Sequence, residues 1–332
     1  MYPFTHVNAY SIEEAKALLK DGKAAVIAGG TDLLTTMNGM CISEANAPTT
    51  LVNIKTINGL KGITTDSSTG ALKIGALTTL SEIADSPIVK DNQGWKVLAE
   101  AALKAASPEL RNAGTIGGNI CQKPRCIYYR KEYNFFNCLR KRGGENTCYA
   151  ANGLNRFHSI FGSTGSGCYA ICPSDTAPAL VALGAKIITS NGEWDAKDFF
   201  YVGDRYDQIN DIAADEIVKE IVVPAPAAGA KSTYLKFAFR KAIDFPLVSV
   251  AVVANTSNGT VSDASIVLGG VFNMPYRATK AESSINGKAI TETNAADAGT
   301  AGLQDNLANE APQAKYKVQV AKTLIKRALL AL

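Results

Sequence analysis

One stretch decides the fold: residues 24–32 read Ala24-Ala25-Val26-Ile27-Ala28-Gly29-Gly30-Thr31-Asp32. Its first four residues have the continuous apolar character of a buried strand. The adjacent glycines let main-chain N–H groups approach a phosphate closely, while Thr31 can add a hydroxyl donor and Asp32 can cap whatever follows. A plain tight turn is the more frequent meaning of a single Gly-Gly pair, and without GxGxxG spacing a Rossmann nucleotide site is not supported.

A second glycine-rich element strengthens the phosphate-binding interpretation. A helix is predicted over residues 95–106, and it is followed by Gly114-Thr115-Ile116-Gly117-Gly118-Asn119-Ile120. Two such turns are what a chain needs to hold the two ends of a long dinucleotide such as FAD, with its pyrophosphate on backbone N–H groups.

The rest of the chain indicates about two domains. Ser11-Ile12-Glu13-Glu14 reads as a capping box that opens a short helix through Leu19. The Pro/Ala/Gly run over 224–230 cannot extend a helix or strand regularly, so it marks a linker. The elements predicted beyond it are strands from 234, over 248–254 and over 261–271, a hairpin signal at Asn258-Gly259, and helices near 278–285 and over 312–330. This order predicts an α+β domain.

Six of the seven cysteines fall between residues 121 and 172. They are Cys121, Cys126, Cys138, Cys148, Cys168 and Cys172, whereas Cys41 lies far upstream. The odd total, the chain length and the lack of an N-terminal signal sequence argue against a secreted disulfide scaffold. Zinc sites usually carry two close CxxC pairs, which this sequence lacks, while a four-iron cluster on loops tolerates wider spacing. A cluster, zinc, and unrelated buried or free thiols all remain open at this point.

Composition excludes several classes of function. With 46% hydrophobic and 19% charged residues, the chain is expected to bury a large core. No run approaches the ~18 apolar residues that span a bilayer, so no membrane span is expected. The net charge is only +4, and basic residues beside anionic thiolates have a simpler electrostatic role than binding nucleic acid. No constellation of acid, base and nucleophile is visible.

Several motifs taken in order make the chain recognisable. The motifs are Ala28-Gly29-Gly30-Thr31-Asp32, Thr115-Ile116-Gly117-Gly118-Asn119, Pro173-Ser174-Asp175, Tyr234-Leu235-Lys236-Phe237-Ala238-Phe239-Arg240, Gly269-Gly270-Val271 and Pro275-Tyr276-Arg277-Ala278. Together they resemble the FAD-binding subunit of the molybdenum hydroxylases, a family that includes xanthine dehydrogenase, carbon monoxide dehydrogenase and aldehyde oxidoreductases. The resemblance implies an α+β fold. A two-lobed FAD-binding domain of the vanillyl-alcohol-oxidase/PCMH type is expected over 1–225, and a CO-dehydrogenase-flavoprotein-like domain over 231–332.

The cysteine-rich insert, residues 121–168, narrows the resemblance. Most FAD subunits of the family pass directly from Gly-Gly-Asn to Pro-Ser-Asp, whereas Arg125-Cys126-Ile127-Tyr128-Tyr129-Arg130 and the residues after it are similar to bacterial aldehyde oxidoreductase subunits with an extra four-iron cluster. More distantly, the insert is similar to the beta subunit of 4-hydroxybenzoyl-CoA reductase. The resemblance implies a [4Fe-4S] cluster held by Cys126, Cys138, Cys148 and Cys168, with Cys121 able to replace one of them.

The resemblance also implies the flavin contacts. The expected FAD-binding residues are Val26, Ile27, Ala28, Gly29, Gly30, Thr31, Asp32, Gly114, Thr115, Gly118, Asn119, Cys121, Ser174, Asp175, Val218 and Lys236. Val218 would pack on the ring system, and Lys236 would stabilise reduced anionic flavin. Without the resemblance, a lysine in an alternating strand is usually a solvated residue. Neither His6 nor His158 is expected to be a ligand, and His158 is expected to hydrogen-bond and pack against the cluster loop.

Family logic gives this chain an electron-transfer role in a heterotrimer. Substrate chemistry on an aldehyde or purine would occur at a molybdenum-cofactor subunit, and electrons would pass through a two-iron-cluster subunit to FAD here and then to an external acceptor. Two alternatives are a zinc-stabilised scaffold without flavin and a stand-alone flavin oxidase. The complex is expected in the cytoplasm, or in the periplasm by co-export with a signal-bearing partner.

Overall fold

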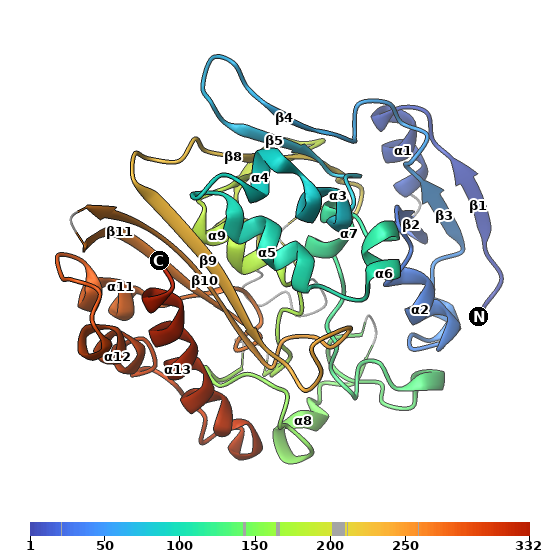
Figure 1. The fold of residues 1–332 in the computed structure, drawn as a ribbon. Helices are drawn as coiled ribbons and strands as arrows, with labels where there is room; N and C mark the ends of the chain where they lie inside the picture. Colours follow the sequence, from blue (N-terminus) through green and yellow to red (C-terminus); the bar gives the residue numbers. More distant parts are fainter. Residues whose placement is uncertain (21, 142–143, 164–166, 201–209, 211, 258) are drawn as a thin grey trace.

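The computed structural model describes residues 1–332 except 21, 142–143, 164–166, 201–209, 211 and 258. The described strands form a three-stranded sheet of order β1-β3-β2, a five-stranded sheet of order β4-β5-β8-β6-β7 and a four-stranded sheet of order β12-β11-β10-β9. Figure 1 shows three connected regions, each built of one of these sheets and the helices beside it. This is the mixture of elements that the α+β prediction requires.

The N-terminal lobe places the first glycine turn at the end of a parallel sheet. Its elements are β1 (Thr5–Asn8), α1 (Ile12–Leu19), β2 (Ala24–Ile27), α2 (Leu33–Asn38), η1 (Glu44–Asn46) and β3 (Thr50–Asn53). Both outer strands run parallel to β3, with Val26 opposite Val52. Ser11 Oγ accepts the N–H of Glu14 at 3.1 Å, as predicted, but the Glu14 carboxylate accepts the N–H of Tyr10 rather than of Ser11.

The middle lobe contains the second glycine turn. Its strands are β4 (Ile63–Thr65), β5 (Leu72–Gly75), β6 (Lys186–Thr189), β7 (Glu193–Asp195) and β8 (Val218–Val223), and its helices are α3 (Leu80–Asp85), α4 (Pro87–Lys90), α5 (Lys96–Lys104), α6 (Pro108–Ala113), α7 (Ile116–Ile120), α9 (Thr176–Ala182) and α10 (Ala196–Phe199). Helix α5 confirms the helix predicted over 95–106. The sheet is antiparallel. At its centre β8 pairs with β5, which comes from much earlier in the sequence, and with β6.

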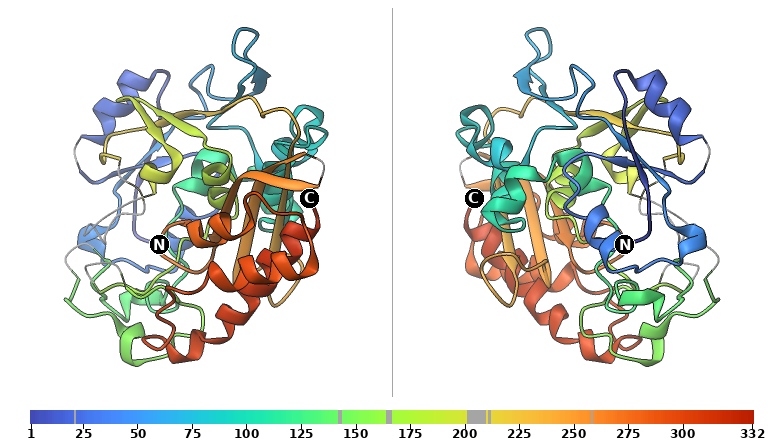
Figure 2. Two further views of the ribbon diagram at one scale, coloured as in Figure 1. Left: turned by 90° about the vertical axis from the view of Figure 1, so that its left-hand side faces the viewer. Right: turned by 90° about the vertical axis from the view of Figure 1, so that its right-hand side faces the viewer.

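The C-terminal region is a sheet with helices on both faces. Its elements are β9 (Ala230–Phe237), β10 (Val248–Ser257), β11 (Thr260–Gly269), β12 (Tyr276–Arg277), α11 (Thr279–Ile285), α12 (Glu292–Ala301), η3 (Pro312–Ala314) and α13 (Tyr316–Leu330). Ser257 pairs with Thr260 across the predicted hairpin, although Asn258 itself lies outside the described residues. Figures 1 and 2 show α11, α12 and α13 on one face of this sheet and the middle-lobe helices on the other.

Strand alternation explains how the sheet joins two hydrophobic cores. In β10, Val248, Val250 and Val252 are buried in the core beneath α11–α13. Ala251 points the other way and joins Tyr234 in the core of the middle lobe. Because side chains alternate along a strand, one sheet closes both cores.

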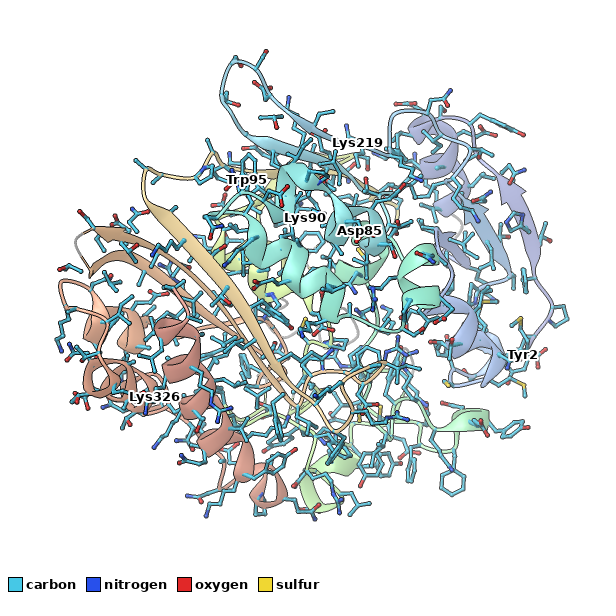
Figure 3. The ribbon with its side chains drawn as sticks, viewed as in Figure 1. Tyr2, Asp85, Lys90, Trp95, Lys219 and Lys326 are labelled. Carbon is cyan, nitrogen blue, oxygen red and sulfur yellow. The ribbon has the colours of Figure 1, made fainter. Side chains whose placement is uncertain are left out.

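The linker is fixed to the middle lobe. Trp95, labelled in Figure 3, donates its indole N–H to the carbonyl of Pro224 at 2.9 Å. Ser232, in β9, donates to the carbonyl of Gln93 and accepts the N–H of Val97. Within the described ranges, no helix combines the length and the apolar character needed to cross a bilayer.

Candidate functional site

The two glycine turns lie against each other. A Cβ built on Gly29 would lie 2.0 Å from the carbonyl oxygen of Ala113 and 3.1 Å from the Cα of Gly114. Gly30, with φ of +70°, has the left-handed conformation that glycine adopts without strain. The absence of side chains at this junction therefore brings main chain from the two lobes together. We call this junction of the two turns the glycine cradle; the sequence predicts that it binds the pyrophosphate of a dinucleotide.

The second turn is a short helix rather than a loop. Gly117 and Gly118 lie inside α7, and Thr115 caps it by accepting the N–H of Gly118 at 3.1 Å. A Cβ at Gly117 would be 3.0 Å from Ala76, so this face of α7 is closed against the middle lobe. The sequence analysis expected a turn at these glycines; a helix forms instead because the Thr115 cap and the burial of the helix's two isoleucines together offset the low helix propensity of glycine.

A buried polar network connects the second and third motifs. Asn119 Oδ1 accepts hydrogen bonds from Ser174 Oγ at 2.6 Å and from Thr176 Oγ1 at 2.7 Å. Ser174 Oγ also accepts the N–H of Ala177, at the start of α9. Thr176 was missed by the sequence analysis, although its hydroxyl next to the Pro173-Ser174-Asp175 motif could have suggested it. The structure thus brings Asn119 and Ser174 together, as the candidate site requires.

Asp175 and Lys236 form a buried ion pair. Lys236 Nζ donates to Asp175 Oδ2 at 2.9 Å and to the carbonyl of Lys104 at 2.8 Å, and the two charged side chains are 6% and 4% exposed. The alternative in which Lys236 is solvated is wrong. Tyr234 Oη donates to the other Asp175 oxygen at 2.6 Å. Burial raises the pKa of Asp175, while Lys236 and Tyr234 oppose that rise.

Asp32 has a different role from the expected helix cap. It stands at the N-cap position of α2 but makes no capping hydrogen bond with its side chain. Instead its carboxylate receives Arg125 at 2.8 Å, Arg130 at 2.7 Å and the backbone N–H of Lys123 at 2.9 Å. Two guanidinium groups compete more strongly for a carboxylate than backbone N–H groups do. Asp32 therefore ties the first glycine turn to the cysteine-rich insert.

Of two expected flavin contacts, Val218 lies in the protein core and Cys121 is half-buried at its edge. Val218 is buried in β8, where it pairs with Thr189. Cys121 follows α7, and its sulfur accepts the side-chain N–H of Asn210 at 3.3 Å. Burial raises the pKa of Cys121 to about 12, which keeps it a neutral thiol. The contact of either residue with a flavin stays a prediction.

Four cysteines surround one cavity in the insert. The residues that line this cavity are Cys126, Tyr128, Tyr129, Cys138, Leu139, Arg140, Cys148, Tyr149, Ala150, Cys168 and Ala170. These are the four cysteines expected as ligands, and Cys41, Cys121 and Cys172 do not line it. All seven cysteines are free thiols. The insert is mostly loop, with η2 (Glu132–Asn134) and α8 (Tyr149–Asn152), at the bottom of Figure 1.

The spacing of the thiols bears on the kind of metal. Among the described residues, no group of three or more His, Cys, Asp or Glu side chains is arranged to hold a single metal ion. A tetrahedral zinc site needs all its sulfurs about 2.3 Å from one point. A four-iron cluster binds each thiolate to a different iron, so its thiolates lie further apart. Among the described residues the four thiols line one cavity without converging as a single-ion site, so zinc finds no support here and the cluster stays a prediction.

Positive side chains stand next to these thiols. Arg140 is buried and donates through Nε to Cys168 Sγ at 3.3 Å. Lys141, also buried, donates to the side-chain oxygen of Asn134 at 2.8 Å. Burial raises the pKa of Cys126 to about 12 and raises the pKa values of Cys138 and Cys148. A metal bound by these cysteines would displace their protons.

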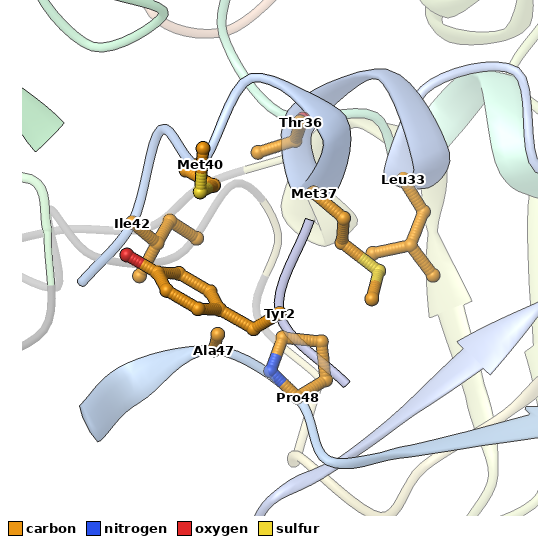
Figure 4. A pocket seen from close by; sticks show the side chains of 8 residues that line it. All are labelled: Tyr2, Leu33, Thr36, Met37, Met40, Ile42, Ala47 and Pro48. Atoms are coloured by element: carbon orange, nitrogen blue, oxygen red, sulfur yellow. The ribbon is translucent and has the colours of Figure 1, made fainter. Parts of the chain in front are cut away.

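The apolar pocket shown in Figure 4 is separate from both sites. It is lined by Tyr2, Leu33, Thr36, Met37, Met40, Ile42, Ala47 and Pro48. Its lining carries no charged group, and Thr36 Oγ1 is already engaged by Arg130 and by the carbonyl of Asp32. It offers no chemistry for a reaction.

Comparison with known proteins gives two family matches. Residues 2–226 match the FAD binding domain in molybdopterin dehydrogenase, and residues 233–332 match the CO dehydrogenase flavoprotein C-terminal domain. The chain is 32% identical over 269 residues to the aldehyde oxidoreductase FAD-binding subunit PaoB of Escherichia coli (strain K12), covering 79% of each. It is 31% identical over 328 residues to the carbon monoxide dehydrogenase medium chain of Hydrogenophaga pseudoflava, covering 96% of this chain and 93% of that one.

A solved structure supports the same assignment. Carbon monoxide dehydrogenase from Hydrogenophaga pseudoflava, lacking the Mo-pyranopterin moiety of its cofactor, matches with a TM-score of 0.74 and 29% identity. The match covers 100% of this chain and 98% of that chain. The two-part fold predicted from the sequence is thereby confirmed.

Proposed function

The chain belongs to the FAD-binding subunits of the molybdenum hydroxylases. From this membership we propose that it transfers electrons to an external acceptor, and from its four-cysteine cavity that it carries a [4Fe-4S] cluster beside FAD. The family assignment favours an oxidoreductase subunit over the zinc-stabilised scaffold without flavin. FAD binding follows from the family. The cluster, the electron path and the residues in contact with either cofactor are the proposal.

The FAD-binding residues proposed are those expected from the sequence, from Val26–Asp32 to Lys236. The close approach of Gly29 to Ala113 supports the glycine cradle. The hydrogen bonds from Ser174 and Thr176 to Asn119 support a second turn that is fixed in place. When bound, FAD supplies the capacity to take up and release electrons. Lys236, held by Asp175, is a buried cation that would offset negative charge on the reduced cofactor.

One observation carries the cluster proposal: the four cysteines named from the sequence line a single cavity that the other three do not reach. Cys126, Cys138, Cys148 and Cys168 would hold the cluster as thiolates, which is the donor set that iron–sulfur clusters use. When present, the cluster supplies a one-electron carrier. The ion pairs of Asp32 with Arg125 and Arg130 would keep this carrier in a fixed relation to the first glycine turn.

The proposed partners are a molybdenum-cofactor subunit and a two-iron-cluster subunit, in a heterotrimer. The support is that relatives of this chain are named as subunits or medium chains of larger enzymes. An aldehyde is the proposed substrate of the complex, because the relative at 32% identity belongs to an aldehyde oxidoreductase. The domain limits proposed are 1–225 and 231–332, with the insert at 121–168.

The test is a cofactor analysis of the full chain purified with its partner subunits. We expect flavin absorbance at about 450 nm. We also expect about four irons and four sulfides on this subunit, in addition to the iron and sulfide of the partner subunits. Cys138→Ser should remove the iron of this subunit and keep the flavin. Cys41→Ser is the matched control, since Cys41 is a buried thiol outside the cavity. One zinc in place of iron, or equal iron in both variants, would overturn the cluster proposal.

A further inference from the structure

His158 lies behind one of the cavity cysteines. Its Nε2 is 3.2 Å from Cys126 Sγ, yet His158 does not line the cavity. The side chain is buried, and its ring lies 6.3 Å from that of Tyr128, centroid to centroid. It therefore contacts the outer side of a proposed ligand and is not itself placed to bind the metal.

The surroundings of the ring decide which nitrogen carries the proton. His158 Nδ1 is buried and has no hydrogen-bond partner of acceptable geometry among the described residues. Burial lowers the pKa of the ring, and the carbonyl of Asn155, which acts to raise that pKa, already accepts the backbone N–H of His158 at 3.0 Å. A metal-bound Cys126 is a thiolate with no proton of its own, so it can only accept. A neutral histidine gains most by placing its single proton on Nε2, facing the sulfur, because an N–H buried at Nδ1 would stay unsatisfied.

Two contacts from the C-terminal region fix the backbone of this segment. Lys317 on α13 is fully buried and donates to the carbonyls of His158 at 3.0 Å and of Gly270 at 2.8 Å. Asn155 and Gln313 exchange two hydrogen bonds, each from a backbone N–H to a side-chain oxygen. These contacts hold the backbone of this segment in place and so fix where the imidazole ring starts.

We propose that His158 is a positioning residue that donates an N–H···S hydrogen bond to Cys126 and thereby sets the reduction potential of the cluster, with Lys317 holding it in place. The inference rests on the proposed four-iron cluster. A hydrogen bond to a ligating sulfur stabilises the reduced cluster, which carries one more negative charge, and so raises the potential. The hydrogen bond from Arg140 to Cys168 should raise the reduction potential in the same way.

The experiment compares His158→Phe with His158→Gln in the complete complex. Phenylalanine removes the donor and keeps a ring, while the glutamine amide can still donate. At a fixed poised potential, His158→Phe should lower the ratio of reduced to oxidised cluster about tenfold, equivalent to about 59 mV for one electron. His158→Gln should recover most of that ratio, and Lys317→Met should show a smaller shift in the same direction. The readout is the EPR signal of the reduced cluster during a redox titration.

A second readout detects the hydrogen bond itself. With ¹⁵N-labelled histidine, pulsed EPR should show a nitrogen coupling to the reduced cluster that disappears in His158→Phe. An iron-loaded complex whose potential does not differ between wild type and both variants would overturn the inference alone. Loss of iron in both His158 variants, with FAD retained, would make His158 a ligand and overturn it as well. A wild-type subunit without iron would instead overturn the proposed function, and this inference with it.

Discussion

The two candidate cofactor sites of this molecule are built in opposite ways. The glycine cradle lies between regular elements, β2 and α2 on one side and α6 and α7 on the other, and presents main chain. The cysteine cavity lies among loops and presents side chains, with α8 and η2 as brief helical pieces. The cradle depends on space that side chains would fill, whereas the cavity depends on long-range contacts that hold loops in place.

The largest expected effect breaks the cradle alone. In Gly29→Ala the new Cβ would meet the carbonyl of Ala113 at 2.0 Å, so the two turns must separate. We expect a loss of about 3 kcal/mol in the free energy of unfolding and at least about a hundredfold weaker FAD binding. Flavin content after gel filtration and denaturant unfolding measure the two quantities.

The control for this substitution is Gly184→Ala. Gly184 also has no side chain, but its Cβ would meet nothing within 4 Å, and only its left-handed φ of +62° is strained. We expect about 1 kcal/mol of destabilisation and full flavin content. Iron content should stay unchanged in both variants, and equal loss of flavin from both would show that the cradle is not specific.

The next effect acts on the connection between the two sites. Asp32→Asn removes the charge that receives Arg125 and Arg130, and leaves two guanidinium groups close together. Because these side chains are partly buried, we expect a loss of about 2 kcal/mol and faster amide exchange over residues 121–130. Hydrogen exchange with mass spectrometry measures the second effect.

Asp66→Asn is the matched control, since Asp66 pairs with Lys73 on an exposed hairpin. An exposed pair of this kind contributes little to stability because water screens the two charges. If both variants showed the same exchange over 121–130, Asp32 would not tie the insert to the glycine turn.

A third prediction concerns how the stability of the chain depends on pH through Lys317, which holds the backbone of His158. Burial lowers the pKa of Lys317 from 10.5 to about 7, so the folded chain releases this proton near neutral pH while the unfolded chain keeps it. Between about pH 7 and 10 the unfolded state binds more protons, and stability therefore rises with pH. The contribution is at most about 1.4 kcal/mol for each pH unit. In Lys317→Met the free energy of unfolding should not rise with pH in this way. If the free energies of unfolding of the two proteins changed with pH in parallel, Lys317 would not be the group responsible.

The glycine cradle was the part most open to prediction. Its motifs are short and local, so Gly29, Gly30 and Thr115 could be named from neighbouring residues alone. The helical form of residues 116–120 was missed because two glycines disfavour a helix, whereas the cap and the tertiary packing that stabilise it cannot be read from local propensity. Helix α12 was also missed, because its sequence of small and polar residues gives no clear apolar stripe.

The cavity could be predicted only through its cysteines and a family resemblance. Asp32 is about ninety residues from Arg125 and Arg130, and no sequence pattern indicates that they meet. The burial of Lys236 and Lys317 is equally invisible, since a lysine is normally solvated until tertiary structure supplies its acceptors. Long-range electrostatic contacts are therefore what the sequence did not reveal.

The smallest effect sharpens the comparison within the cradle. Thr115→Val removes the hydroxyl that accepts the N–H of Gly118 and keeps the shape of the side chain, while Thr115→Ser keeps the hydroxyl. We expect Thr115→Val to cost about 1 kcal/mol and to weaken FAD binding about fivefold, because α7 then frays and its main chain is less well placed. Thr115→Ser should stay close to wild type in both. Flavin titration and thermal unfolding separate the variants. Equal weakening of FAD binding by both variants would contradict a role of the cap, because Thr115→Ser keeps the capping hydroxyl. An unchanged affinity in both would mean that the cradle rests on the first turn alone.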